Sequence, residues 1–226
     1  KMQVSLYKVA SFEVIDIPLL EKIGLTKKPV IMSRGMSSLQ ELKLAIKTLK
    51  NHGAPQVAIL HCVSSYPAKP EEMNLATIAD LPKKMRTIAG LSDHTLGINV
   101  AIAAVALGAS IIEKHLILRR ADGGPDAAFS LEPEEFKKLV QSIREIEKAV
   151  GSPNYKTGEK EKENIIFRKS LFVVEDIKKG NRFTSKNVRS IRPGHGLSPK
   201  HLNRVIGSVV KKNIKRGTPL NWNLIK

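Results

Sequence analysis

Residues 88–115 have the sequence Ile-Ala-Gly-Leu-Ser-Asp-His-Thr-Leu-Gly-Ile-Asn-Val-Ala-Ile-Ala-Ala-Val-Ala-Leu-Gly-Ala-Ser-Ile-Ile-Glu-Lys-His and give the clearest indication of the architecture. Two short apolar runs, Ile88–Ser92 and Ser110–His115, flank an almost wholly apolar run, Ile98–Leu107. Strand-length runs on either side of a helix-length run predict a strand-helix-strand unit. The central run predicts a buried helix because it is apolar nearly all round, with Thr95 as its candidate N-terminal cap.

The same pattern extends towards the N-terminus. Five runs have strand length and end in polar or small residues: Leu6–Ser11, Val30–Ser33, Val57–His61, Ile88–Ser92 and Ser110–His115. Their first residues lie 24, 27, 31 and 22 positions apart, which is close to one strand plus one helix each time. Near-continuous apolar strands that alternate with helices are typical of a parallel sheet covered by helices. The sequence therefore predicts an α/β fold.

Capping residues mark two of the intervening helices. Ser38 and Glu41 form a capping box ahead of an apolar stripe, and Gly53 ends that helix. Pro133 begins another helix with one continuous apolar stripe, and Gly151 ends it.

The composition changes after Gly151. Residues 152–164 are polar and charged, which predicts a linker. Beyond the linker, the strand-like runs Leu171–Val174 and Val205–Val210 are separated by glycine-containing turns, which predicts a small β-rich domain. We therefore divide the chain into residues 1–151, a linker at 152–164 and a second domain at 165–226.

Composition bounds the surroundings of the protein. The longest apolar stretch is too short for the ~20 residues of a membrane helix. The first residues lack the apolar core of a signal peptide. The single cysteine, Cys62, excludes an internal disulfide and favours a reducing compartment. We expect a cytoplasmic protein with no membrane contact.

The net charge is +17, and basic residues dominate between Arg168 and Lys226. They are spaced among apolar residues, and no RNA-recognition, zinc-finger or helix-turn-helix signature accompanies them. A solvated basic surface is therefore favoured over a nucleic-acid face. A phosphate-bearing substrate would explain part of the excess charge.

Polar side chains gather where the five strand-like runs end. In chain order they are Lys8, Ser11 and Glu13; Ser33; His61 to Ser65; Ser92, Asp93 and His94; and Glu113, Lys114 and His115. In a parallel β/α barrel, the catalytic groups come from the C-terminal ends of the strands. The distribution indicates an active site rather than a core.

Two histidines, His94 and His115, end consecutive strands. A single histidine in such a place is more often a hydrogen-bonded structural group than a ligand. Neighbouring strands lie ~4.8 Å apart, so both imidazoles could reach one metal ion. From the spacing alone, a metal site and a structural role are equally favoured.

Two lysines, Lys8 and Lys114, suggest a Schiff-base aldolase. Lys114 directly precedes His115, so alternation along the strand sends the two side chains to opposite faces. If His115 faces the barrel interior, Lys114 faces the helices or solvent. The same alternation separates Lys8 from Glu13, unless the chain leaves the strand after Ser11.

Several segments together resemble the sialic acid synthase family. They are Tyr7-Lys-Val-Ala-Ser-Phe-Glu13, Lys28-Pro-Val-Ile-Met-Ser-Arg-Gly-Met36, Leu60-His-Cys-Val-Ser-Ser-Tyr-Pro67, Gly90-Leu-Ser-Asp-His-Thr95, Ile112-Glu-Lys-His115, Gly124-Pro-Asp126, Ser130-Leu-Glu-Pro133 and Arg192-Pro-Gly-His-Gly196. The similarity covers essentially the whole chain, in the order and spacing of the family. Chance agreement of eight such segments in order is not plausible.

This resemblance implies a partial TIM-type β/α barrel, about the last five βα units, followed by a small antifreeze-protein-like β-rich domain. It implies synthesis of a sialic-type acid from phosphoenolpyruvate and an N-acetylated amino-hexose by carbon–oxygen cleavage, with no lysine imine. It further implies a domain-swapped homodimer and a divalent metal, Mn²⁺ or Mg²⁺. By similarity, the metal ligands are His94 and His115. The phosphoenolpyruvate contacts are Lys8, Ser11, Ser33, Ser64 and Ser92. The sugar contacts are Glu13, Tyr66 and Asp126, of which Glu13 and Asp126 are the catalytic acid–base candidates, and Arg192 binds substrate from the partner subunit.

Two departures from the family pattern matter. A full barrel takes roughly 250 residues, whereas only about 150 precede the linker, so the first three strands are absent and we expect this chain alone to be inactive. Ser64 stands where N-acetylneuraminate synthases usually have asparagine. Together with Asp126-Ala-Ala-Phe-Ser130, it favours the pseudaminic acid synthase branch, which uses a di-N-acetylated dideoxy hexose.

The remaining alternatives differ in class. An N-acetylneuraminate or legionaminic acid synthase would share the chemistry and differ in the sugar. A truncated chain could instead be a non-catalytic sugar-binding or scaffold protein. A nucleic-acid-binding module has only the net charge in its favour, and salt-dependent DNA binding would test it.

Overall fold

A computed structural model describes residues 3–226 of the chain. The chain forms two compact units, one ending at Ser152 and the other beginning at Pro153. Each unit has its own cluster of buried apolar side chains.

The first unit contains five parallel strands that follow one another in space as they do in sequence. They are β1 (Tyr7–Val9), β2 (Val30–Ser33), β3 (Val57–Cys62), β4 (Ile88–Asp93) and β5 (Ile112–Lys114). All five strands predicted for this unit are present and within three residues of their expected bounds. The prediction of an α/β fold with a parallel sheet, forming part of a β/α barrel, is therefore confirmed.

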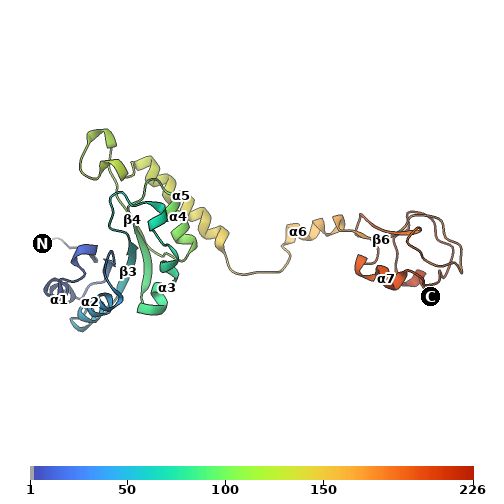
Figure 1. Ribbon diagram of the computed structural model, residues 1–226, viewed down its shortest axis with the longest axis horizontal. Coiled ribbons are helices and arrows are strands. Elements are labelled where there is room, and N and C mark those ends of the chain that lie inside the picture. Colours follow the sequence, from blue (N-terminus) through green and yellow to red (C-terminus); the bar gives the residue numbers. More distant parts are fainter. Residues whose placement is uncertain (1–2) are drawn as a thin grey trace. The chain divides into compact units, whose positions relative to one another are not determined.

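Five α-helices follow the strands and lie at the periphery of the unit (Figure 1). They are α1 (Ile17–Gly24), α2 (Leu39–Asn51), α3 (Ala76–Met85), α4 (Asn99–Ala106) and α5 (Pro133–Val150). Short 3₁₀ turns lie in the loops: η1 (Ser11–Glu13), η2 (Pro70–Glu72), η3 (Arg120–Asp122) and η4 (Ala127–Phe129).

The predicted capping box begins α2. The Ser38 hydroxyl accepts from the Glu41 backbone N–H at 3.2 Å, and the Glu41 carboxylate accepts from the Ser38 N–H at 2.7 Å. The Ser38 N–H and hydroxyl both donate to the Glu41 carboxylate, and these bonds hold the pKa of Glu41 below its usual value. The predicted bounds of α5, from Pro133 to the residue before Gly151, are confirmed as well.

The expectations for α4 were only partly right. The helix forms, but its N-terminal cap position is Ile98 rather than Thr95, whose hydroxyl binds Asp93 instead. The helix is also not buried all round, because only its alanine face, Ala101 and Ala104, is buried against β4 and α5. The larger residues of this helix are half-buried, so apolarity alone overstated the burial.

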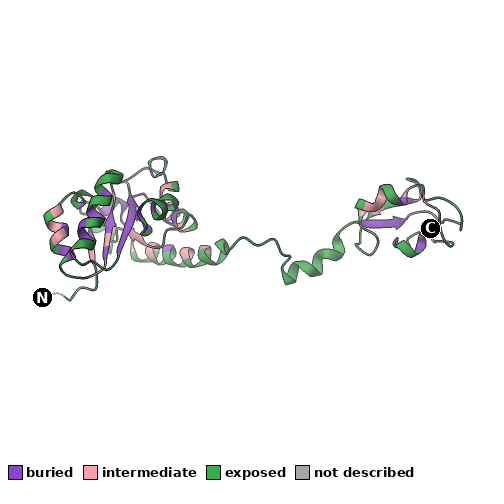
Figure 2. Ribbon diagram, turned by 90° about the horizontal axis from the view of Figure 1, so that it is seen from below, coloured by how far each residue is buried: buried purple, intermediate pink, exposed green. Residues whose placement is uncertain are grey.

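Alternation along the strands divides the sheet into two faces. Val9, Met32, Ile59 and Leu91 point towards the helices and belong to the buried core. Their neighbours along each strand point the other way, and at the C-terminal ends these neighbours are polar. Figure 2 shows the strands of this unit mainly in the colour of buried residues, whereas the helices expose one side. The fold thus gathers polar groups on the inner face of the sheet.

The second unit is built around a two-stranded antiparallel sheet, β6 (Ser170–Val173) paired with β7 (Val188–Ile191). Its other elements are α6 (Glu159–Glu163), η5 (Asn164–Phe167), η6 (Pro199–His201), α7 (Leu202–Val205) and η7 (Trp222–Leu224). The predicted strand at Leu171–Val174 is present, shifted by one residue. The predicted strand at Val205–Val210 was wrong, since α7 ends there and only isolated bridges follow.

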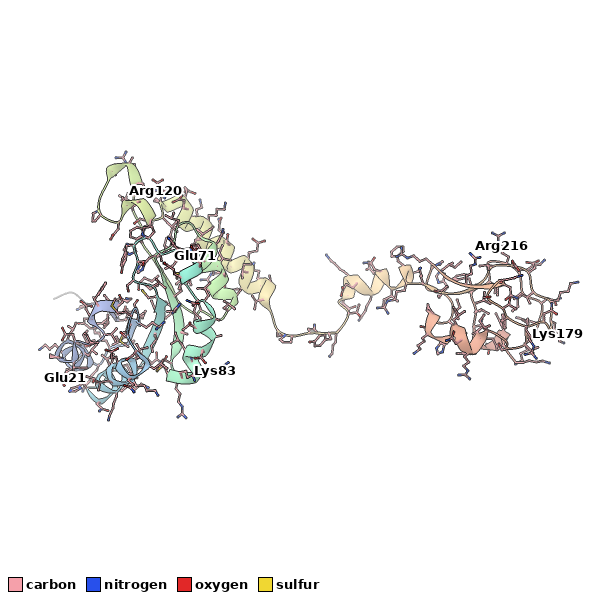
Figure 3. All side chains as sticks on the ribbon, viewed as in Figure 1. Glu21, Glu71, Lys83, Arg120, Lys179 and Arg216 are labelled. Atoms are coloured by element: carbon pink, nitrogen blue, oxygen red, sulfur yellow. The ribbon has the colours of Figure 1, made fainter. Side chains whose placement is uncertain are left out.

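The excess positive charge belongs mainly to the second unit. Residues 165–226 contain 15 lysines and arginines but only two acidic residues, Glu175 and Asp176. Asp176 is already paired with Lys215 at 2.7 Å. Figure 3 shows Lys179 and Arg216 projecting outward from this unit. No helix among residues 3–226 has the length and apolarity that crossing a membrane requires.

Removal of the α2 cap should destabilise the first unit. We expect Ser38→Ala to lower the free energy of unfolding by about 1 kcal/mol, because the Glu41 N–H loses its acceptor. Urea unfolding followed by circular dichroism measures this change. Ser110→Ala is the matched control, since Ser110 is exposed and its hydroxyl makes no hydrogen bond with residues 3–226. Equal stability of the two variants would contradict the role of the cap.

Candidate active site

The C-terminal ends of the strands form one polar site on the inner face of the sheet. Lys8 of β1 makes an ion pair with Glu113 of β5, with Nζ 3.3 Å from Oε2. The Ser92 hydroxyl of β4 donates to the other oxygen of Glu113 at 3.2 Å. Residues from three strands are therefore linked, and two of them, Lys8 and Ser92, are predicted phosphoenolpyruvate contacts.

A second polar pair joins the loops after β1 and β3. The hydroxyls of Ser11 and Ser64 lie 3.0 Å apart. Gly35 makes this approach possible: its φ is +48°, and a Cβ placed on it would lie 2.4 Å from the Cβ of Ser11. The glycine is thus required both by its own backbone and by its neighbours.

Ser33 lies on the same inner face, at the end of β2. Its side chain is buried, with 2% of the residue exposed, and its hydroxyl has no hydrogen-bond partner among residues 3–226. A buried hydroxyl without a partner costs free energy, so this group is suited to binding a ligand atom. The thiol of Cys62 shares this face, and burial raises its pKa.

Four rings cluster beside the serine groups. The ring of Tyr66 lies 4.2 Å from that of His94, and His94 and His115 lie 5.3 Å apart between ring centroids. Phe129 closes the cluster at 5.0 Å from His115. Burial raises the pKa of Tyr66, which therefore stays protonated at neutral pH.

His94 is held in one tautomer. Its Nδ1 lies 2.9 Å from the carbonyl oxygen of Val63, which can only accept, so Nδ1 carries the proton and Nε2 keeps its lone pair. Burial lowers the pKa of His94 and favours the neutral ring. A neutral imidazole anchored through Nδ1 is the usual form of a metal ligand.

Two imidazole rings are the candidate metal donors. Residues 3–226 contain no group of three or more His, Cys, Asp or Glu side chains that could hold a metal ion. The ring centroids of His94 and His115 lie 5.3 Å apart, and imidazole is the commonest metal ligand in proteins, so these two residues fit a divalent ion.

The two candidate acid–base residues have different surroundings. A carboxylate oxygen of Asp126 lies 3.5 Å from Nδ1 of His115, so Asp126 belongs to the ring cluster. Glu13 lies in η1, because β1 ends at Val9 and the chain leaves the strand as required. Its carboxylate accepts from the Ala10 N–H at 2.9 Å, so part of its hydrogen-bonding capacity is used locally.

Lys114 is not available for imine chemistry. As the alternation predicts, its amine lies on the helix side of the sheet, buried in an ion pair with Asp93 at 2.7 Å. An amine that is buried in an ion pair and has no access to the inner face cannot attack a carbonyl there. The geometry therefore removes Lys114 from the Schiff-base alternative.

The sequence placed Glu113 among the polar strand-end residues without giving it a role, and it did not single out Phe129. Glu113 links Lys8 to Ser92 and faces the interior, and the alternation argument used for Lys114 would have placed it there. Phe129 carried no signal, because an isolated aromatic residue in a loop gives no periodicity.

Arg192 directly follows β7 in the second unit and is exposed.

Both units of the chain match known protein families. Residues 1–155 match the NeuB family and residues 168–226 match the SAF domain. The chain belongs to the NeuB family.

Relatives of this chain include synthases of several sugar acids. It is 40% identical to a pseudaminic acid synthase of Helicobacter pylori over 96% of its length, and 40% identical to an N,N'-diacetyllegionaminic acid synthase of Campylobacter jejuni over 95%. The solved N-acetylneuraminic acid synthetase of Leptospira borgpetersenii is 39% identical and covers 72% of the chain and 57% of that protein, with a TM-score of 0.67.

The NeuB-family chain is shorter than its relatives. It spans between 62% and 66% of the length of the first five curated relatives that it matches, including 64% of the pseudaminic acid synthase and 65% of the legionaminic acid synthase. The resemblance to sialic acid synthases is confirmed, whereas the roles of individual site residues stay predictions.

The approach of Ser11 and Ser64 should depend on the missing side chain at position 35. We expect Gly35→Ala to lower the free energy of unfolding by about 1–3 kcal/mol more than Gly108→Ala does. Both glycines have positive φ, but a Cβ at Gly108 meets nothing within 4 Å, so the difference isolates the clash with Ser11. Urea unfolding of the two variants measures it, and equal losses would show that only the backbone strain matters.

Proposed function

We propose that the protein carrying this chain condenses phosphoenolpyruvate with an N-acetylated amino-hexose to give a sialic-type acid and phosphate. The observation that supports this most directly is the inner face itself. A lysine, four serines and two histidines face one another there, which suits a phosphorylated carboxylate beside a metal. Membership of a family whose relatives make such acids gives independent support.

The polar groups divide between the two substrates. Lys8 and the hydroxyls of Ser11, Ser33, Ser64 and Ser92 hold the phosphate and carboxylate of phosphoenolpyruvate as donors. Glu113 orients the Lys8 amine and prevents it from turning away from the site. Tyr66 and Asp126 bind the amino-hexose beside the histidines, and Asp126 or Glu13 moves protons at the sugar hydroxyl and the attacking water.

His94 and His115 would hold a divalent ion, Mn²⁺ or Mg²⁺, which supplies Lewis-acid polarisation of the sugar aldehyde when bound. C3 of phosphoenolpyruvate forms the new bond to the aldehyde carbon. Water adds at C2, and the tetrahedral product expels phosphate by breaking the carbon–oxygen bond. This route forms no covalent bond to the protein, which agrees with a Lys114 amine that cannot reach the inner face.

The finer assignment is to a pseudaminic acid synthase, with a di-N-acetylated dideoxy hexose as substrate. The short Ser64 side chain and the Asp126-Ala-Ala-Phe-Ser130 segment support it. Legionaminic acid synthases remain the second candidate, because the relative from Campylobacter jejuni is as similar as the pseudaminic acid synthases. Initial rates distinguish these candidates when they are measured with the amino-hexose of pseudaminic acid synthases, with that of legionaminic acid synthases and with N-acetylmannosamine.

The reaction itself can be followed with isotopes. Full-length protein given phosphoenolpyruvate with ¹⁸O in the bridging position should release labelled phosphate, since the carbon–oxygen bond breaks. Chelator should abolish turnover, and His115→Ala should do the same without loss of folded structure. Label retained in the sugar acid would contradict the route, and turnover that survives the chelator would contradict the metal.

Arg192 is proposed to bind the amino-hexose in the barrel of the partner subunit of a domain-swapped homodimer. Its guanidinium makes no hydrogen bond or ion pair with residues 3–226, and the turn after it is fixed instead by Ser170, whose hydroxyl donates to the Pro193 carbonyl at 2.7 Å. Arg192 is therefore not needed to brace the turn and is free to bind a ligand.

Replacement of this arginine should affect one substrate more than the other. We expect Arg192→Lys to lower kcat/KM for the amino-hexose about ten- to a hundredfold, because lysine cannot reproduce the paired hydrogen bonds of guanidinium. The KM for phosphoenolpyruvate should change little. Arg189→Lys, at an exposed arginine of the preceding strand β7, is the control. Equal effects on both substrates would contradict the proposal.

A further inference from the structure

The most deeply buried charges of the first unit lie behind the two histidines. The side chains of Asp93 and Lys114 are 0% and 1% exposed, and Lys114 Nζ lies 2.7 Å from Asp93 Oδ2. The two residues are direct partners across β4 and β5. Both point towards the helices, away from the proposed substrates, so neither takes part in the chemistry.

Thr95, the residue after His94, forms hydrogen bonds with both members of this ion pair. Its backbone N–H and its hydroxyl both donate to Asp93 Oδ1, at 2.9 and 2.8 Å. The Lys114 amine donates to the Thr95 carbonyl oxygen. The ion pair therefore fixes the residues before and after His94 and ties them to the residue before His115.

Stability alone does not account for such a pair. Removing two charges from water costs about as much as their attraction returns, so buried ion pairs are often replaceable by apolar side chains without loss. What a pair of this kind provides is fixed geometry, because the carboxylate accepts and the amine donates hydrogen bonds only in certain directions. Here the groups that it fixes are the backbone positions that carry His94 and His115.

We propose that Asp93 and Lys114 are positioning residues that hold His94 and His115 at the separation needed to share one divalent ion. The inference rests on the proposed function, which makes these histidines the metal ligands. Two side chains on adjacent strands that would hold one ion must both be kept closely in place by the groups around them. The pair does this from the opposite face of the sheet, where it blocks no coordination position.

The test is the affinity of the full chain for Mn²⁺, measured from the paramagnetic resonance signal of the free ion. The double variant Asp93→Asn/Lys114→Met keeps an oxygen acceptor for the Thr95 N–H and leaves no buried charge. We expect it to remain folded and to bind Mn²⁺ ten- to a hundredfold more weakly, the usual effect of losing the groups that orient ligands. The matched control, Asp176→Asn/Lys215→Met, removes an ion pair of the same length in the second unit and should bind as the original chain does.

A milder pair of variants covers the case in which the double variant does not fold. Thr95→Val removes one hydrogen bond to Asp93 with little change in volume and should weaken Mn²⁺ binding several-fold, whereas Thr95→Ser should restore it. Unchanged affinity in the folded double variant, or in Thr95→Val, would overturn the positioning role. Unchanged affinity in His94→Ala would instead overturn the proposed metal site itself, so the two failures are distinguishable.

Discussion

The alternation of side chains along five parallel strands determines both the core and the candidate site of the first unit. Each strand must bury one face against the helices, and this fixes which residues face the interior. Val9 and Leu91 are in the core, and their neighbours Lys8 and Ser92 consequently reach the site. A shift of one residue in the register of any strand would exchange its core-facing residues with its interior-facing residues. The register that packs the core therefore also assembles the site.

Much of this could be predicted from the sequence because it is encoded locally. The five strands and α2 follow from short apolar runs and from capping residues, whose effects act within a few residues. Alternation also predicted correctly that Lys114 lies behind the sheet. Predictions failed where the partner of a segment decides its state. The Val205–Val210 run has strand propensity but no long partner strand, and α4 is apolar on faces that the described helices do not cover.

The site shows the same limit. Residues at strand ends could be assigned to one edge of the sheet, but their pairing required the register between strands. Glu113 illustrates this, because its significance lies in bridging Lys8 of β1 and Ser92 of β4, which are far apart in sequence. The ring of Phe129 reaches His115 only because the loop containing η4 folds back over the strand ends. The periodic hydrophobic patterns that predict strands and helices give no information about the path of such a loop.

Under the proposed function, selectivity for the amino-hexose is a question of shape rather than of mechanism, since relatives named for different products are equally similar to this chain. The Ser11–Ser64 pair bears on this question. In a pair of hydroxyls, one proton is shared between the two oxygens and the other stays free, so the pair can still donate to a substrate oxygen. A longer amide at position 64 would fill the space that Gly35 keeps open and would present a donor further into the site. Under the proposed function, the residue at position 64 therefore changes both the room and the hydrogen-bond donors that an amino-hexose meets, while the chemistry stays the same.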